Sequence, residues 1–222
     1  MFLGHYGVAF AARRAAPRMS LGTLTLAAQW LDELWPILLL AGVEHVRVVP
    51  GLMRASPADF VWYPYSHSLA MAIVWGALFA LIYFAARRDR RSALIVGGAV
   101  VSHWLLDLPM HRPDLPLWPG SRILLGAGAW NSIPLTILLE GGVFVLGLWL
   151  YLRSTRATDR TGTWSLWAMV AVLVAIFASG FFNPPPPSEH TVAVATLMIW
   201  LFVPWSYWID RHRALIDPAP RA

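Results

Sequence analysis

The chain contains no cysteine and no lysine, and it carries few charges of either sign. Without cysteine it can form neither a disulfide framework nor a thiolate zinc site. Only 13% of its 222 residues are charged and 58% are hydrophobic, which excludes an ordinary soluble domain. Because the chain has no cysteine, any metal site must use His, Asp and Glu, ligands that suit Zn²⁺ or another divalent first-row ion.

What the chain does have is a series of apolar segments of bilayer length. They predict an all-α, polytopic transmembrane helical bundle of about six spans, preceded by a short N-terminal helix at 2–12. We expect a single integral-membrane domain over 1–213 and a disordered tail over 214–222. The expected spans are 21–43, 65–86, 92–110, 133–152, 164–182 and 190–209.

The arginines indicate an orientation. All 17 basic residues are arginines, thirteen of them at one set of segment ends and four at the other. Such clusters are typical of membrane helix ends and do not favour nucleic-acid binding. Because positive charge gathers on the cytoplasmic side, we predict a multi-pass protein with both termini cytoplasmic.

The segment 92–110 ends in a group of potential metal ligands. His103 and Asp107 are four residues apart and share one face of a helix. His111 follows just beyond Pro109, where the chain can turn back. Ionisable side chains are costly in lipid, so they imply a polar partner, a wet cavity or a metal.

Other segments carry ionisable residues too. Asp32 and Glu140 lie inside predicted spans. Each could be a metal ligand, a proton acceptor or half of a buried ion pair. Ser66 is an expected helix N-cap that would place His67 in the first turn. His5 alone is typical of an interfacial histidine, and the orientation puts it on the far side from His67 unless its helix re-enters the membrane.

Four short motifs, in this order, give the chain a resemblance to a known family. It resembles the YdjM/YbcI-like family of inner-membrane metal-dependent hydrolases over roughly its first 120 residues, and is more distantly similar to zinc-dependent phospholipase C enzymes. The motifs are Gly4-His5, Asp32 within Leu-Asp-Glu-Leu-Trp-Pro, Ser66-His67-Ser68-Leu69, and Ser102-His103-Trp104-Leu105-Leu106-Asp107.

The resemblance implies a location and a ligand set. It implies the bacterial inner (cytoplasmic) membrane and a divalent metal, Zn²⁺ by its chemistry. Two departures, at Asp32-Glu33 followed by Trp35 and at Tyr63-Pro64-Tyr65, argue against a full second metal unless Glu44, His111 or Glu140 compensates. The implied metal ligands are His5, Asp32, His67, His103 and Asp107.

These expectations combine into a hydrolase that acts on a phosphoester or lipid-linked substrate taken from the membrane. In this hypothesis a metal activates water, Asp32 or Glu140 is the general base and His111 protonates the leaving group. Two alternatives stay open. The same residues could form the path of a proton or ion transporter, or they could pair across helices in a non-catalytic structural protein.

Overall fold

The predicted all-α membrane bundle is confirmed in the computed structural model of the protein, which describes residues 1–216. Residues 217–222 of the expected tail lie outside the described residues. Five helices are long and apolar enough to cross a membrane. They are α4 (Leu69–Arg87), α5 (Arg90–Met110), α6 (Ile133–Ser154), α7 (Arg160–Ser179) and the run Glu189–Arg211, which comprises α8 (Glu189–Thr196), a 3₁₀ turn η2 (Leu197–Leu201) and α9 (Phe202–Arg211).

The expected first span behaves differently from the other five. It forms α2 (Leu21–Leu40), which is bilayer length but is not among the five apolar helices, because Gln29, Asp32 and Glu33 lie in its middle. Its N-cap is Ser20, whose side chain accepts from the Thr23 amide. Most of its residues are buried among α1, α5, α8 and α9. It is an internal helix that carries acids into the bundle.

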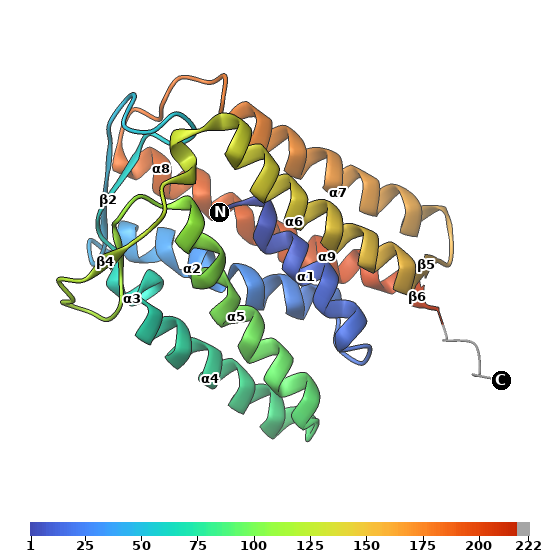
Figure 1. The fold of residues 1–222 in the computed structure, drawn as a ribbon. Coiled ribbons are helices and arrows are strands. Elements are labelled where there is room, and N and C mark those ends of the chain that lie inside the picture. The colour runs from blue at the N-terminus through green and yellow to red at the C-terminus, as the bar shows by residue number, and fades with distance from the viewer. Residues whose placement is uncertain (217–222) are drawn as a thin grey trace.

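The short N-terminal helix α1 (Leu3–Ala15) is also internal (Figure 1). It packs against α2, α5 and α6, and its two faces belong to two hydrophobic cores. Two glycines allow this close packing: a Cβ on Gly147 of α6 would collide with the Gly7 carbonyl oxygen, and a Cβ on Gly7 would collide with the Val143 carbonyl oxygen. The chain therefore begins inside the bundle and runs outward.

This placement corresponds to the re-entering helix that the sequence left open for His5. The Met1 amino group pairs with Asp107 in the interior, whereas Arg13 near the end of α1 pairs with Asp210 at the end of α9, 3.3 Å away. The arginine count could not show that α1 enters the bundle, and the cytoplasmic location of both termini stays a prediction.

Three small antiparallel ribbons close the two ends of the bundle. At one end, β1 (His45–Val48) pairs with β2 (Ala58–Trp62), and β3 (Leu115–Pro116) pairs with β4 (Leu124–Leu125). At the other end, β5 (Thr155–Ala157) pairs with β6 (Arg213–Leu215). Residues 214 and 215 of the expected disordered tail are therefore part of an ordered strand.

The segment before α4 also differs from the expectation. Ser66 does not cap the helix; it lies in a separate short turn, α3 (Pro64–His67). Ser68 is the N-cap of α4, and its side chain accepts from the Met71 amide. Ser66 is thereby free to contact His67.

Candidate metal centre

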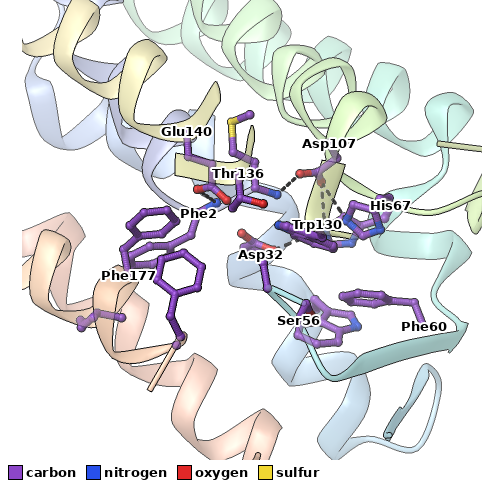
Figure 2. A pocket seen from close by; sticks show the side chains of 17 residues that line it. Phe2, Asp32, Ser56, Phe60, His67, Asp107, Trp130, Thr136, Glu140 and Phe177 are labelled. Atoms are coloured by element: carbon purple, nitrogen blue, oxygen red, sulfur yellow. Dashed lines mark hydrogen bonds and ion pairs between the residues drawn. The ribbon is translucent and has the colours of Figure 1, made fainter. Parts of the chain in front are cut away.

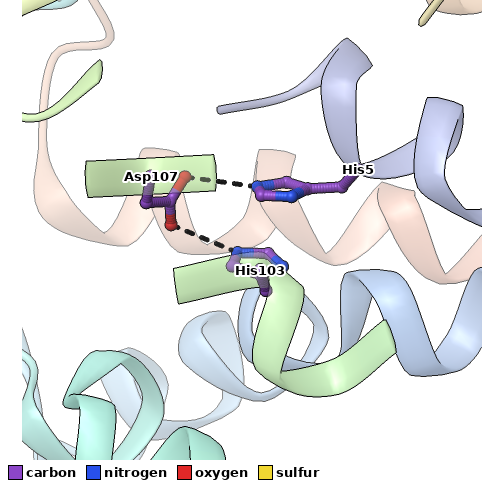
Figure 3. Close-up of side chains that lie close together, drawn as sticks. All are labelled: His5, His103 and Asp107. Carbon is purple, nitrogen blue, oxygen red and sulfur yellow. Dashed lines mark ion pairs between the residues drawn. The ribbon is translucent and has the colours of Figure 1, made fainter. Parts of the chain in front are cut away.

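Four helices bring the predicted ligands together at one end of the bundle. His5 comes from α1, and His103 and Asp107 come from α5 (Figure 3). Asp32 comes from α2 and His67 from the end of α3 (Figure 2). Two groups of three have ligand atoms within 4.8 Å of one another: His5, His103 and Asp107, and Asp32, His67 and His103. His103 belongs to both groups. We call these five residues the His/Asp cluster.

The distances within the cluster suit a shared ion. His5 Nε2 is 3.2 Å from Asp107 Oδ1, and His103 Nε2 is 3.4 Å from Asp107 Oδ2. Asp32 Oδ1 lies 3.4 Å from His67 Nε2 and 3.7 Å from His103 Nε2. Ligands about 2.0–2.1 Å from a tetrahedral ion lie about 3.3 Å from one another. The cluster is therefore close to the size that a divalent cation requires.

A backbone hydrogen bond fixes the orientation of the His103 ring. Its Nδ1 lies 2.8 Å from the backbone carbonyl oxygen of Ala28. A carbonyl can only accept, so Nδ1 carries the proton and the neutral ring presents a lone pair at Nε2. That Nε2 is fully buried and has no hydrogen-bond partner within the described chain. A metal-ligating histidine shows this same arrangement.

His67 is oriented by a carboxylate acting through a serine. Its Nδ1 is 2.7 Å from Ser66 Oγ, which in turn donates to Glu44 Oε2 at 2.5 Å. Glu44 also accepts from the amides of Tyr65 and Ser66. Burial raises the pKa of Glu44, and these donors oppose the rise. Since the Ser66 proton is engaged, its oxygen can accept from His67, and His67 Nε2 faces Asp32.

His111 lies next to the His/Asp cluster, close to Asp107. Its Nε2 is 3.9 Å from Asp107 Oδ2, and its Nδ1 is 2.9 Å from Asp114 Oδ1. The Tyr63 hydroxyl donates to the same Asp114 oxygen at 3.1 Å. Burial lowers the pKa of His111, which favours the neutral ring. A neutral His111 that donates through Nδ1 offers a lone pair, rather than a proton, at Nε2.

Glu140 lies beside the cluster but is engaged elsewhere. Its Oε2 accepts from the amides of Phe2 and Leu3 at 2.6 and 2.8 Å. The amides at the start of a helix have no acceptor within the helix, and the helix dipole favours a carboxylate there. Glu140 thus anchors the helix that carries His5, and its role as general base stays a prediction.

A cavity of about 230 Å³ opens onto the cluster (Figure 2). Asp32, His67, Asp107, His111 and Glu140 form part of its wall. The rest of the wall is mainly apolar and aromatic, with Phe2, Phe60, Trp130 and Phe177 among its residues. Asp32 is the most exposed member of the cluster, with 23% of its side chain accessible. The cluster is therefore reachable from a small, largely apolar chamber.

The donor set fits a divalent cation. Imidazole nitrogens and carboxylate oxygens form two buried groups that share His103. Among residues 1–216 no arginine lies within ion-pair distance of Asp32 or Asp107, and the cation beside Asp107 is the Met1 amino group. Within residues 1–216 Asp32 has histidine neighbours and no arginine partner, so the buried ion pair that the sequence left open for it is not formed there with an arginine. Leaving His103 Nε2 unpaired would cost about 1–3 kcal/mol.

Sequence reasoning missed the groups that support the ligands. The Ala28 carbonyl holds the His103 ring, and Glu44, through Ser66, holds the His67 ring, both from distant parts of the chain. Asp114 holds the His111 ring from three residues away. The Ser-His-Ser motif did contain a signal, because a polar neighbour next to a ligand histidine is a usual orienting group.

The comparisons with known proteins place the chain in a family. The model of the family described as YdjM inner membrane protein matches residues 63–183, over half of the chain. The match includes His67, His103 and Asp107 but neither His5 nor Asp32, and it extends beyond the first 120 residues on which the resemblance rested. Neither curated proteins nor solved structures gave a match. The chain is a member of the YdjM inner membrane protein family.

Proposed function

We propose that the protein is a membrane-embedded metal-dependent hydrolase of phosphoester lipids. One observation carries the proposal: His103 Nε2 is buried and unpartnered, has its tautomer set by Ala28, and faces the carboxylates of Asp32 and Asp107. His5 and His67 complete a set of donors suited to Zn²⁺.

The chain's own residues have distinct tasks in this proposal. A divalent cation held by the cluster would polarise the ester and acidify a water molecule. Asp32 faces the chamber, so its carboxylate can take a proton from that water. The buried Asp107 lies between His5 and His103 and would bind the cation together with them. His111 would have to be protonated to serve as an acid, so it is better suited to bind a cation or accept a proton.

The substrate class follows from where the chamber lies. Apolar and aromatic residues form much of its wall, and the bundle presents membrane-length helices on its outside. A water-soluble substrate gains little from such a wall, whereas a lipid headgroup enters with its chains in an apolar environment. We therefore propose a lipid or lipid-linked phosphoester.

A second function is favoured by a separate set of buried polar groups. Gln29 and Glu33 have side-chain oxygens and nitrogens without partners in the described chain. Further along α2, Thr25 donates to Ser206 at 2.9 Å. Together they continue from the cluster toward the arginine-rich end, as a proton or ion path would. The convergence of ligands on one point favours the hydrolase.

A hydrolysis screen tests the first proposal. The purified protein is reconstituted into vesicles of defined phospholipids with Zn²⁺, and released phosphate and headgroups are measured alongside ion flux. We expect hydrolysis that is abolished in His103→Ala and retained in His190→Ala, whose histidine is exposed on α8. Ion flux without hydrolysis of any lipid would instead support the path.

A further inference from the structure

A second hollow adjoins the chamber of the His/Asp cluster. It has a volume of about 910 Å³ and lies between the segment 48–60, which includes part of the β1–β2 hairpin, and the loop 179–186 that follows α7. We call it the hairpin groove. The residues shared by the two cavities are Trp35, Ala55, Ser56, Phe60, Gly180 and Phe181. The groove and the chamber therefore adjoin and share part of their walls.

The wall of the hairpin groove is largely apolar, with one ionisable side chain. That residue is Arg54. The remainder includes Met53, Val192 and three consecutive prolines at 184–186. Beside the loop that closes the groove, Phe182 is 85% exposed. Such an exposed aromatic side chain is suited to a membrane interface.

Arg54 has a charge that the described chain leaves uncompensated. Two other arginines at this end share Asp59: Arg47 at 2.7 Å, and Arg112 in close contact. Arg54 is exposed, and no acid among residues 1–216 pairs with it. An unpaired guanidinium beside an apolar groove is complementary to an amphipathic anion.

The loop that carries Arg54 is held in place. The Ala55 amide donates to the Trp130 carbonyl at 2.9 Å, and Trp130 borders the chamber. The Val49 amide donates to the Pro57 carbonyl at 2.8 Å, which closes the base of the loop. The guanidinium is therefore presented from an ordered segment tied to the wall of the chamber.

We propose that the hairpin groove is the lipid entrance to the cluster and that Arg54 binds the anionic phosphate of the lipid headgroup. The apolar wall takes the first part of the acyl or prenyl chain, and the guanidinium forms paired hydrogen bonds to phosphate oxygens. This inference rests on the proposed function and narrows its substrate class to anionic phospholipids, with phosphatidic acid as the simplest case.

Binding, rather than turnover, tests the proposal. The probe is a fluorescent phosphonate analogue of dioleoyl phosphatidic acid, which resists hydrolysis, titrated against the metal-loaded full chain in detergent. We expect Arg54→Gln to weaken binding about tenfold, the loss of roughly one charged contact. Arg54→Lys should bind with intermediate affinity, because lysine keeps the charge but not the fork geometry. Arg122→Gln is the matched control, since Arg122 is exposed outside the groove.

Competition identifies what is recognised. Phosphatidic acid should displace the probe, whereas dioleoylglycerol and inorganic phosphate should compete poorly. Equal affinity of wild type and Arg54→Gln would overturn the proposal, as would full displacement by dioleoylglycerol or by phosphate alone.

The two proposals fail in different ways. Arg54-dependent lipid binding without hydrolysis of any lipid would leave the entrance intact and remove the hydrolase. Hydrolysis that needs Asp107, together with binding that ignores Arg54, would remove only the entrance.

Discussion

Two acids at opposite ends of the bundle, Asp210 and the buried Asp107, have different kinds of partner. Asp210 accepts from the Leu21 amide at 2.7 Å and pairs with Arg13 at 3.3 Å. Asp107 has the imidazole nitrogens of His5 and His103 3.2 and 3.4 Å away, with those of His67 and His111 at 3.9 Å. It also pairs with the Met1 amino group.

The difference separates a structural acid from a candidate ligand. Arginine is a permanent cation, so the Asp210 pair is complete and holds the start of α2 to α9. The rings of His67, His103 and His111 each have Nδ1 at a hydrogen-bonding partner, so their Nε2 atoms can present lone pairs toward carboxylates. Lone pairs repel carboxylates unless a cation or a proton lies between them. Asp107 has the Met1 amino group at Oδ1 and the Nε2 atom of His103 beside Oδ2, so its second oxygen suits a further cation or a proton, whereas Asp210 is already fully paired.

The largest expected effect on metal affinity comes from replacing each of the two acids with its amide. We expect Asp107→Asn to lower the affinity for Zn²⁺ by at least a hundredfold, because it removes the charge at the centre of the donor set. Asp210→Asn should bind Zn²⁺ like the wild type. Competition with a chromophoric chelator measures both, and equal losses in the two variants would contradict the distinction.

The next largest effect on metal affinity is expected from the groups that orient the histidine rings. Glu44→Gln keeps the size of the side chain but weakens the acceptor that holds Ser66 and, through it, His67. We expect a 10- to 100-fold loss of metal affinity, as is usual for an orienting partner. The same titration measures it. Asp59→Asn, which alters an acid paired only with arginines, is the control.

At the end of the bundle that carries Arg13, we expect a loss of folding stability without a loss of metal. Asp210→Asn should lower the free energy of unfolding by about 1–3 kcal/mol, because Arg13 and the Leu21 amide lose a charged acceptor. Metal content should stay unchanged. Chemical denaturation in detergent gives the first value and elemental analysis the second; a stable Asp210→Asn protein that lost its metal would reverse our assignment.

The smallest expected effect is a pH dependence at His111. Its pKa is lowered in the folded protein by burial, so below about pH 6.5 the unfolded chain takes up a proton that the folded chain does not. Folding stability of the metal-free protein should therefore fall as pH drops through this range. His111→Asn, which retains a donor for Asp114, should flatten the fall. Thermal unfolding at pH 5 and 7 measures it, and parallel profiles would exclude the effect.

Much of the bundle could be predicted because the signals are local. Apolar runs and arginine stops define α4 to α7, and the spacing of His103 and Asp107 needs only the geometry of one helix. His111 is close enough along the chain to follow.

The rest depended on tertiary packing. Nothing local shows that a 13-residue helix enters the bundle; this follows from the Gly7–Gly147 contact and from Glu140 holding the start of α1. Glu44 reaches His67 across 23 residues of chain, through a serine that local patterning indicated as a helix cap. Partners so far apart in sequence leave no periodic pattern.

The central claim, that the His/Asp cluster holds a divalent cation, is tested most directly by the metal content of the purified protein. Wild type, His103→Ala and His190→Ala are washed with a weak chelator and analysed for metal per chain. We predict at least one divalent ion in the wild type and in His190→Ala, and none in His103→Ala. A wild type without bound metal after loading with Zn²⁺, or a His103→Ala protein with undiminished metal, would contradict the account.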